Sequence, residues 1–195
     1  MSKIIVRKIQ KGKWEDYCTG LKSKNKIKRL FEEFMPNASA DAITNCLRTT
    51  RNELSIWIVE EDRINDALLA MSTGSEMNDV SSIEYISFNP SEFKKNGLSY
   101  KQSSSDANTA VVSLKDNHYD IDNLDYKKLG IIQKMIVRKI IKGDSVRVTK
   151  AKLFSIIEDA INADVIDYSS LSEHYIKALR KKYPSKDIPL PIAQE

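Results

Sequence analysis

One segment of the sequence gathers basic side chains at helical spacing. When residues 124–142 are placed on a helix at about 100° per residue, six bases fall within an arc of about 140°: Lys127, Lys128, Lys134, Arg138, Lys139 and Lys142. Ile131 and Met135 point to the same side, whereas a separate apolar row that includes Ile132 and Ile136 faces the core. Bases mixed with apolar residues are typical of a surface that binds protein or nucleic acid. We therefore predict an exposed partner-binding face; the alternative is that neighbouring elements cover Ile131 and Met135.

A histidine with flanking carboxylates forms a second candidate. His118 precedes Asp120 and Asp122, and such a group could supply a general base or one metal ligand. A metal site needs three or four converging ligands, and the only other histidine, His174, is far along the chain. Asp and Asn are also typical of turns, and Asp122 or Asn123 would cap the helix that follows. We expect a structural turn and no metal ion, and keep His118, Asp120 and Asp122 as catalytic candidates.

Other catalytic patterns are missing from the sequence. The hydroxyls at residues 103–105 have no Gly-x-Ser-x-Gly context, and the six glycines form no nucleotide-binding pattern. Cys18 and Cys46 have no neighbouring histidine that would activate a thiol. The sequence therefore predicts no cofactor and favours a protein without enzymatic activity.

The last two predicted helices, residues 149–162 and 170–183, resemble a helix-turn-helix pair in their order. The second would begin at a capping box formed by Ser170 and Glu173. It would present Lys177, Arg180, Lys181 and Lys182 to a phosphate backbone. The connection is longer than the usual turn of such a pair, which counts against this role.

The elements that position these residues indicate a mixed α/β or α+β fold. Residues 4–9, 54–60 and 82–88 have the composition of strands, and a helix over 62–71 with Asp62 as its N-cap lies between the last two. This order predicts a crossover helix and parallel pairing in a small mixed sheet. A lysine-rich helix is expected within 21–35, and the serine-rich segment 99–110 reads as a mobile loop or boundary. We predict an α/β domain over 1–115 and an all-helical subdomain over 116–195, with a single domain as the alternative.

Composition limits the class of protein. The 195 residues are 41% hydrophobic and 30% charged, which suits a globular chain with its own core. The formal charge of +4 is uneven, because residues 1–30 hold ten bases against two acids. No apolar run approaches the roughly 20 residues of a membrane span, and the first residues do not read as an export signal. Two cysteines are too few for a disulfide framework, so we expect a cytoplasmic protein.

These observations leave three functional hypotheses. The first is an accessory or adaptor subunit of a bacterial multi-protein system, of the kind found in defence systems, that acts by binding another protein. The second is a nucleic-acid-binding module that uses residues 1–30 and the basic helical faces. The third is an enzyme that uses His118 with nearby carboxylates. The stretch 117–126, with the 54–59 strand, is similar to parts of small bacterial proteins, a resemblance that implies no activity and no functional residue.

Overall fold

A computed structural model describes residues 2–18, 42, 44, 46–47 and 49–190, with the side chains of 15–18 excepted. Its strands form one sheet in the order β4-β5-β2-β1-β3-β6. They are β1 (Lys3–Ile9), β2 (Leu54–Glu60), β3 (Ile83–Phe88), β4 (Tyr100–Gln102), β5 (His118–Ile121) and β6 (Val146–Val148). The α-helices are α1 (Lys11–Cys18), α4 (Ile64–Ser72), α5 (Pro90–Lys95), α6 (Tyr126–Lys142), α7 (Lys150–Asn162) and α8 (Glu173–Lys182). Short 3-10 turns are η2 (Glu61–Arg63), η3 (Ser104–Asp106), η4 (Val112–Asn117) and η5 (Tyr168–Ser170). The predicted mixed α/β class is confirmed.

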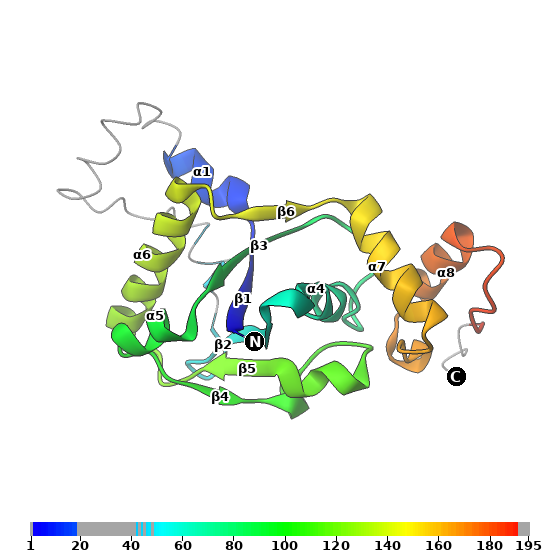
Figure 1. Cartoon of the computed structure of the whole chain (residues 1–195), viewed down its shortest axis with the longest axis horizontal. Coiled ribbons are helices and arrows are strands. Elements are labelled where there is room, and N and C mark those ends of the chain that lie inside the picture. Colours follow the sequence, from blue (N-terminus) through cyan, green and yellow to red (C-terminus); the bar gives the residue numbers. More distant parts are fainter. Residues whose placement is uncertain (1, 19–41, 43, 45, 48, 191–195) are drawn as a thin grey trace.

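Helices cover both faces of this sheet (Figure 1). On one face, α4, α7 and α8 pack through a cluster that includes Leu153 and Tyr175. On the other face, α5, α6 and Trp14 of α1 pack through a second cluster around Ile5 and Ile136. The sheet is apolar on both sides. Consecutive side chains of a strand point to opposite faces of the sheet, and β1 and β2 both bury consecutive residues, as expected for central strands. The α6 helix is thus separated from α7 and α8 by the sheet.

The predicted parallel pairing of residues 54–60 and 82–88 is wrong. Both β2 and β3 pair with β1 in antiparallel fashion, so they run in the same direction with β1 between them. The crossover helix exists as α4, but it spans a split β-α-β unit. The cause is β1, whose buried Ile5 and Val6 supply an apolar strand that fits between the two. Every strand pair in the described part of the chain is antiparallel.

The C-terminal third carries the three expected helices and also contributes two strands. β5 pairs with β2 and β4, and β6 pairs with β3. The division at residue 115 stays a prediction, and in the structure strands from both sides of it share one sheet. The expected helix within 21–35 lies outside the described residues.

Several local expectations need correction. The serine-rich segment forms β4 and η3 and is held to the sheet, since the Ser103 amide donates to the His118 carbonyl at 3.0 Å. Helix α4 has no side-chain cap, because Asp62 lies within η2. The last helix begins at Glu173, with Ser172 as its N-cap instead of Ser170.

Alkaline conditions are expected to destabilise the fold through Tyr175. This buried hydroxyl donates to the Ser72 carbonyl at 2.8 Å, and burial, followed by the charge of Asp79, raises the pKa of its phenol well above the ordinary value. The unfolded chain ionises near pH 10 while the folded chain keeps the proton, so stability present below pH 10 is lost above it. By pH 11.5 this loss is about 2 kcal/mol. Urea unfolding from pH 8 to 11.5 should show a shallower loss for Tyr175→Phe than for the wild type.

The exposed Tyr126 supplies the control for this measurement. Its side chain is 95% exposed, so Tyr126→Phe should keep the alkaline loss of the wild type. Equal losses for Tyr175→Phe and the wild type would show that the buried phenol does not set the pH dependence.

Candidate nucleic-acid interface

Helix α6 is fixed at both ends by its own sequence. The Asp125 carboxylate accepts from the Lys128 amide at 2.7 Å and caps the N-terminus, so the expectation that Asp122 or Asn123 caps this helix is wrong. Gly143 ends the helix with a φ of 81°, a left-handed conformation that favours glycine. Ile132, Ile136 and neighbouring apolar residues bury the inner side against the sheet. Between these ends the helix contains six bases and no acidic residue.

The basic side chains of α6 divide into two groups. Four are exposed, and no carboxylate in the described part of the chain lies within ion-pair distance of them: Lys127, Lys134, Arg138 and Lys142. The other two are half-buried. The Lys128 ammonium donates to the Asn123 carbonyl at 2.8 Å, and Lys139 lies 3.8 Å from Glu92 and 3.9 Å from Asp144. The predicted basic face is therefore narrower than expected, and it consists of the four exposed bases.

The predicted exposure of Met135 is wrong, and that of Ile131 holds only in part. Met135 is only 7% exposed and belongs to the core cluster on this side of the sheet. Ile131 is half-buried and packs against the same cluster. Helix α5 lies beside α6 (Figure 1), and residues of α5 line the same hollow as Met135. Of the two apolar residues that suggested a protein partner, Met135 is thus buried and Ile131 half-buried.

A shallow hollow lies where α5 meets the C-terminal half of α6. Its volume is about 200 Å³, and its lining includes four bases and one carboxylate: Lys95, Arg138, Lys139, Lys142 and Glu92. Glu92 is already engaged, because its carboxylate accepts from the Asn89 amide at 2.8 Å in the capping box of α5. The hollow therefore carries excess positive charge at one end of the exposed basic face. Sequence analysis missed Lys95, for which the adjacent pair Lys94-Lys95 is the available signal.

The structure places His118 in the core. Its side chain is 4% exposed, and its Nδ1 lies 2.8 Å from the Ser103 hydroxyl and 3.1 Å from the Ser103 carbonyl oxygen. The ring packs edge-on against Trp57, with ring centroids 5.0 Å apart. A general base must reach a substrate proton, and this imidazole is instead held between two strands and a turn. Its surroundings are those of a packed core histidine.

The two carboxylates do not join His118 in a catalytic group. Asp120 is buried, and its charge acts on Arg7, whose pKa is lowered to about 10 chiefly by burial. The Arg7 guanidinium donates to the carbonyls of Ser55 and Cys46. Asp122 accepts from the Ser99 hydroxyl at 2.5 Å. The Arg7 bonds join β1 to β2 and to Cys46, and the Ser99–Asp122 bond joins the segments that flank β4 and β5, so each group has a structural partner other than His118.

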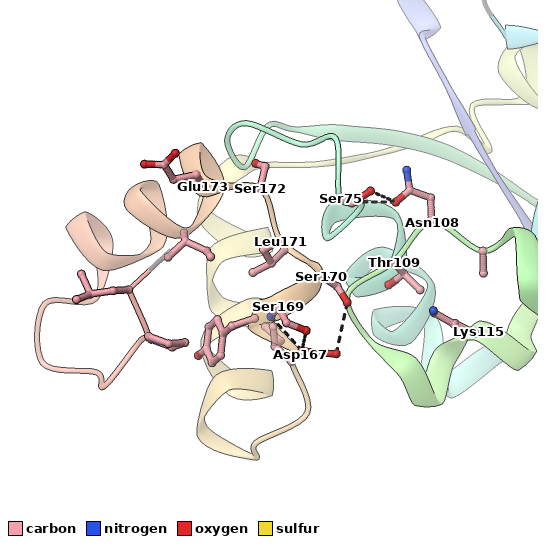
Figure 2. A pocket seen from close by; sticks show the side chains of 16 residues that line it. Ser75, Asn108, Thr109, Lys115, Asp167, Ser169, Ser170, Leu171, Ser172 and Glu173 are labelled. Carbon is pink, nitrogen blue, oxygen red and sulfur yellow. Dashed lines mark hydrogen bonds between the residues drawn. The ribbon is translucent and has the colours of Figure 1, made fainter. Parts of the chain in front are cut away.

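A second hollow, a cleft with polar and apolar lining, lies between η4, η5 and the start of α8 (Figure 2). Its polar groups bond mainly to one another. Asn108 accepts from the amide and the hydroxyl of Ser75, and Asp167 accepts from the amide and the hydroxyl of Ser169. The hydrogen bonds of Asp167 lower its pKa. These bonds shape the loops, and the cleft presents no arrangement of nucleophile and base.

The remaining basic segments offer weaker surfaces. In α8, Lys177 pairs with Glu173 at 2.5 Å and Lys182 lies over the Phe154 ring, while Arg180 and Lys181 are exposed. The apolar side of α8 packs on α7 through Tyr183 and Phe154. Most of the basic N-terminal region lies outside the described residues.

No described helix is long and apolar enough to span a bilayer, and no three described histidine, cysteine or acidic side chains gather as metal ligands would. Comparison with protein-family models, with curated proteins and with solved structures finds no match to this chain.

Proposed function

We propose that the protein binds the sugar-phosphate backbone of nucleic acid through α6. The observation that carries this proposal is the set of four exposed bases, Lys127, Lys134, Arg138 and Lys142, which have no acidic partner in the described part of the chain. They lie along about 22 Å of helix, at a rise of about 1.5 Å per residue. Lysine and arginine side chains that contact phosphates supply most of the affinity in sequence-independent binding.

Burial of Met135 favours nucleic acid over a protein partner. The centre of a protein–protein interface is rich in aromatic and apolar side chains and poor in lysine. Between Lys127 and Lys142 the exposed face of α6 is rich in basic residues, since Met135 packs into the core and Ile131 is half-buried against it. A phosphate backbone needs only positive charge at suitable spacing. The hollow beside α5, with bases on both helices, is a suitable place for one phosphate group.

Replacement of three of these bases tests the proposal. We expect the variant Lys134→Ala/Arg138→Ala/Lys142→Ala to lose about 100-fold in affinity at low salt, and its plot of log affinity against log salt to flatten by about 2. The measurement is fluorescence anisotropy with labelled 20-nucleotide DNA and RNA at several salt concentrations between 50 and 300 mM.

The matched control removes three bases from α8. Lys177→Ala/Arg180→Ala/Lys181→Ala changes the net charge equally and should keep the wild-type affinity and salt slope. An equal loss in both variants would indicate binding to net charge alone, and loss only in the α8 variant would favour the helix-turn-helix hypothesis. Failure of the wild type to bind at 50 mM salt would overturn the proposal.

The other two hypotheses lack support from a specific contact. An adaptor role, with another protein of a bacterial multi-protein system as partner, stays a prediction. Of the two apolar residues that motivated it, Met135 is buried and Ile131 half-buried, which counts against it. A catalytic role of His118 also stays a prediction, and its burial counts against it.

A further inference from the structure

We infer that the nucleic acid bound by α6 is single-stranded and that Tyr126 stacks on one of its bases. This inference rests on the proposed function and specifies its substrate. Tyr126 is the first residue of α6, and its side chain is 95% exposed. No other described aromatic side chain is largely exposed; the rest are buried or half-buried. A single exposed aromatic ring is common on protein surfaces, and Tyr126 becomes a candidate because it stands at the end of a row of exposed basic side chains on the same helix.

Tyr126 continues the row of bases along the helix. Residues four apart lie one above the other on a helix surface, and such a row runs through Tyr126, Gly130, Lys134, Arg138 and Lys142. The row therefore presents, in order, one aromatic ring, one position without a side chain and three basic side chains. Each step advances about 6 Å along the helix. A strand laid along this row would meet phosphate partners at one end and a stacking surface at the other.

Gly130 leaves open the space between the Tyr126 ring and the basic side chains that begin at Lys134. A Cβ atom at this position would meet nothing within 4 Å, so the core does not require glycine here. Glycine within a helix costs about 1 kcal/mol relative to alanine, which makes an unforced glycine noteworthy. The missing side chain leaves open space on the helix surface next to Tyr126, where a nucleotide would lie beside the ring.

Only an unpaired nucleobase can stack on the Tyr126 ring. In a duplex the faces of the bases are stacked on one another, whereas a single strand offers them to aromatic side chains. Stacking on an aromatic side chain tolerates every base, because each has a π-face, so we expect little sequence preference. The basic side chains of Lys134, Arg138 and Lys142 would contact phosphates of the same strand.

Variants of Tyr126 test this inference by anisotropy with a single strand and a duplex of the same length. We expect the wild type to bind the single strand more tightly, Tyr126→Ala to weaken that binding by about 5- to 150-fold, and Tyr126→Phe to retain it. Binding of the duplex should change less than 2-fold in Tyr126→Ala. Because Tyr126 is exposed, both variants should unfold in urea at the wild-type midpoint.

Three outcomes separate this inference from the proposed function. Equal single-strand affinity of Tyr126→Ala and the wild type would overturn the stacking role and leave phosphate binding by α6 intact. A wild type that prefers the duplex would overturn the assignment of a single strand. Absence of binding to either nucleic acid by the wild type would overturn the proposed function itself.

Discussion

Replacing Met135 by alanine should lower the free energy of unfolding by about 2–5 kcal/mol, the usual range for truncation of a buried methionine. The side chain is 7% exposed, belongs to the core cluster beneath α6 and lines the hollow between α5 and α6. Its loss removes apolar contacts and opens a cavity that the neighbouring side chains fill only in part. Lys134→Ala, one residue earlier on the exposed side, should stay within about 0.5 kcal/mol.

Urea unfolding followed by circular dichroism measures both variants. Met135→Leu, which nearly conserves the volume, should cost less than about 1.5 kcal/mol. A Met135→Ala variant as stable as the wild type would mean that this side chain lies on the surface, and the argument for an apolar docking face would return. The comparison therefore tests the observation on which the choice between a nucleic acid and a protein partner depends.

Replacing His118 by alanine should act on stability. The Ser103 hydroxyl would lose its imidazole partner, which costs about 1–3 kcal/mol when the group is buried. The edge-on contact with Trp57 would also be lost, at about 0.5–1.5 kcal/mol. Both contacts are present in the structure, at 2.8 Å for the hydrogen bond and 5.0 Å between ring centroids. We therefore expect a loss of about 2–4 kcal/mol in the free energy of unfolding.

A double-mutant cycle assigns this loss to the Ser103–His118 pair. Ser103→Ala and His118→Ala in combination should be less destabilising than the sum of the two single variants, by about 0.5–3 kcal/mol. Nucleic-acid affinity should stay within 2-fold of the wild type in every folded variant, because His118 and the basic face of α6 lie on different elements. Unchanged stability of His118→Ala would show that the imidazole is not part of the packing, and the catalytic hypothesis would regain weight.

The sequence predicts the elements of this fold well where local patterns are strong. Dense β-branched residues mark β1 and β2, and the spacing of Leu153, Ile156 and Ile157 marks α7. These signals depend on residues close together in the chain. The mixed α/β class follows from them, because strands and amphipathic helices alternate along the sequence.

Predictions that depended on distant residues failed. Nothing local to residues 54–88 indicates that β1 will lie between β2 and β3. In the same way, a helical wheel gives the direction of Met135 but not the presence of α5 beside it. The serine-rich segment reads as a loop because its hydrogen-bond partners, such as Asp116 and His118, come later in the chain. The charged part of the candidate site was predictable, whereas the burial of its apolar part was not.

The central place of β1 has a consequence for synthesis of the chain. Ile5 pairs with Ile58 on one side and Phe88 on the other, so β1 is translated before either of its partners. Until both partners are made, its unpaired backbone and apolar side chains are open to other chains, and contacts so distant in sequence form slowly. The nascent protein is therefore open to aggregation between the synthesis of β1 and that of β3, and a fusion partner of high solubility placed before β1 should improve its yield.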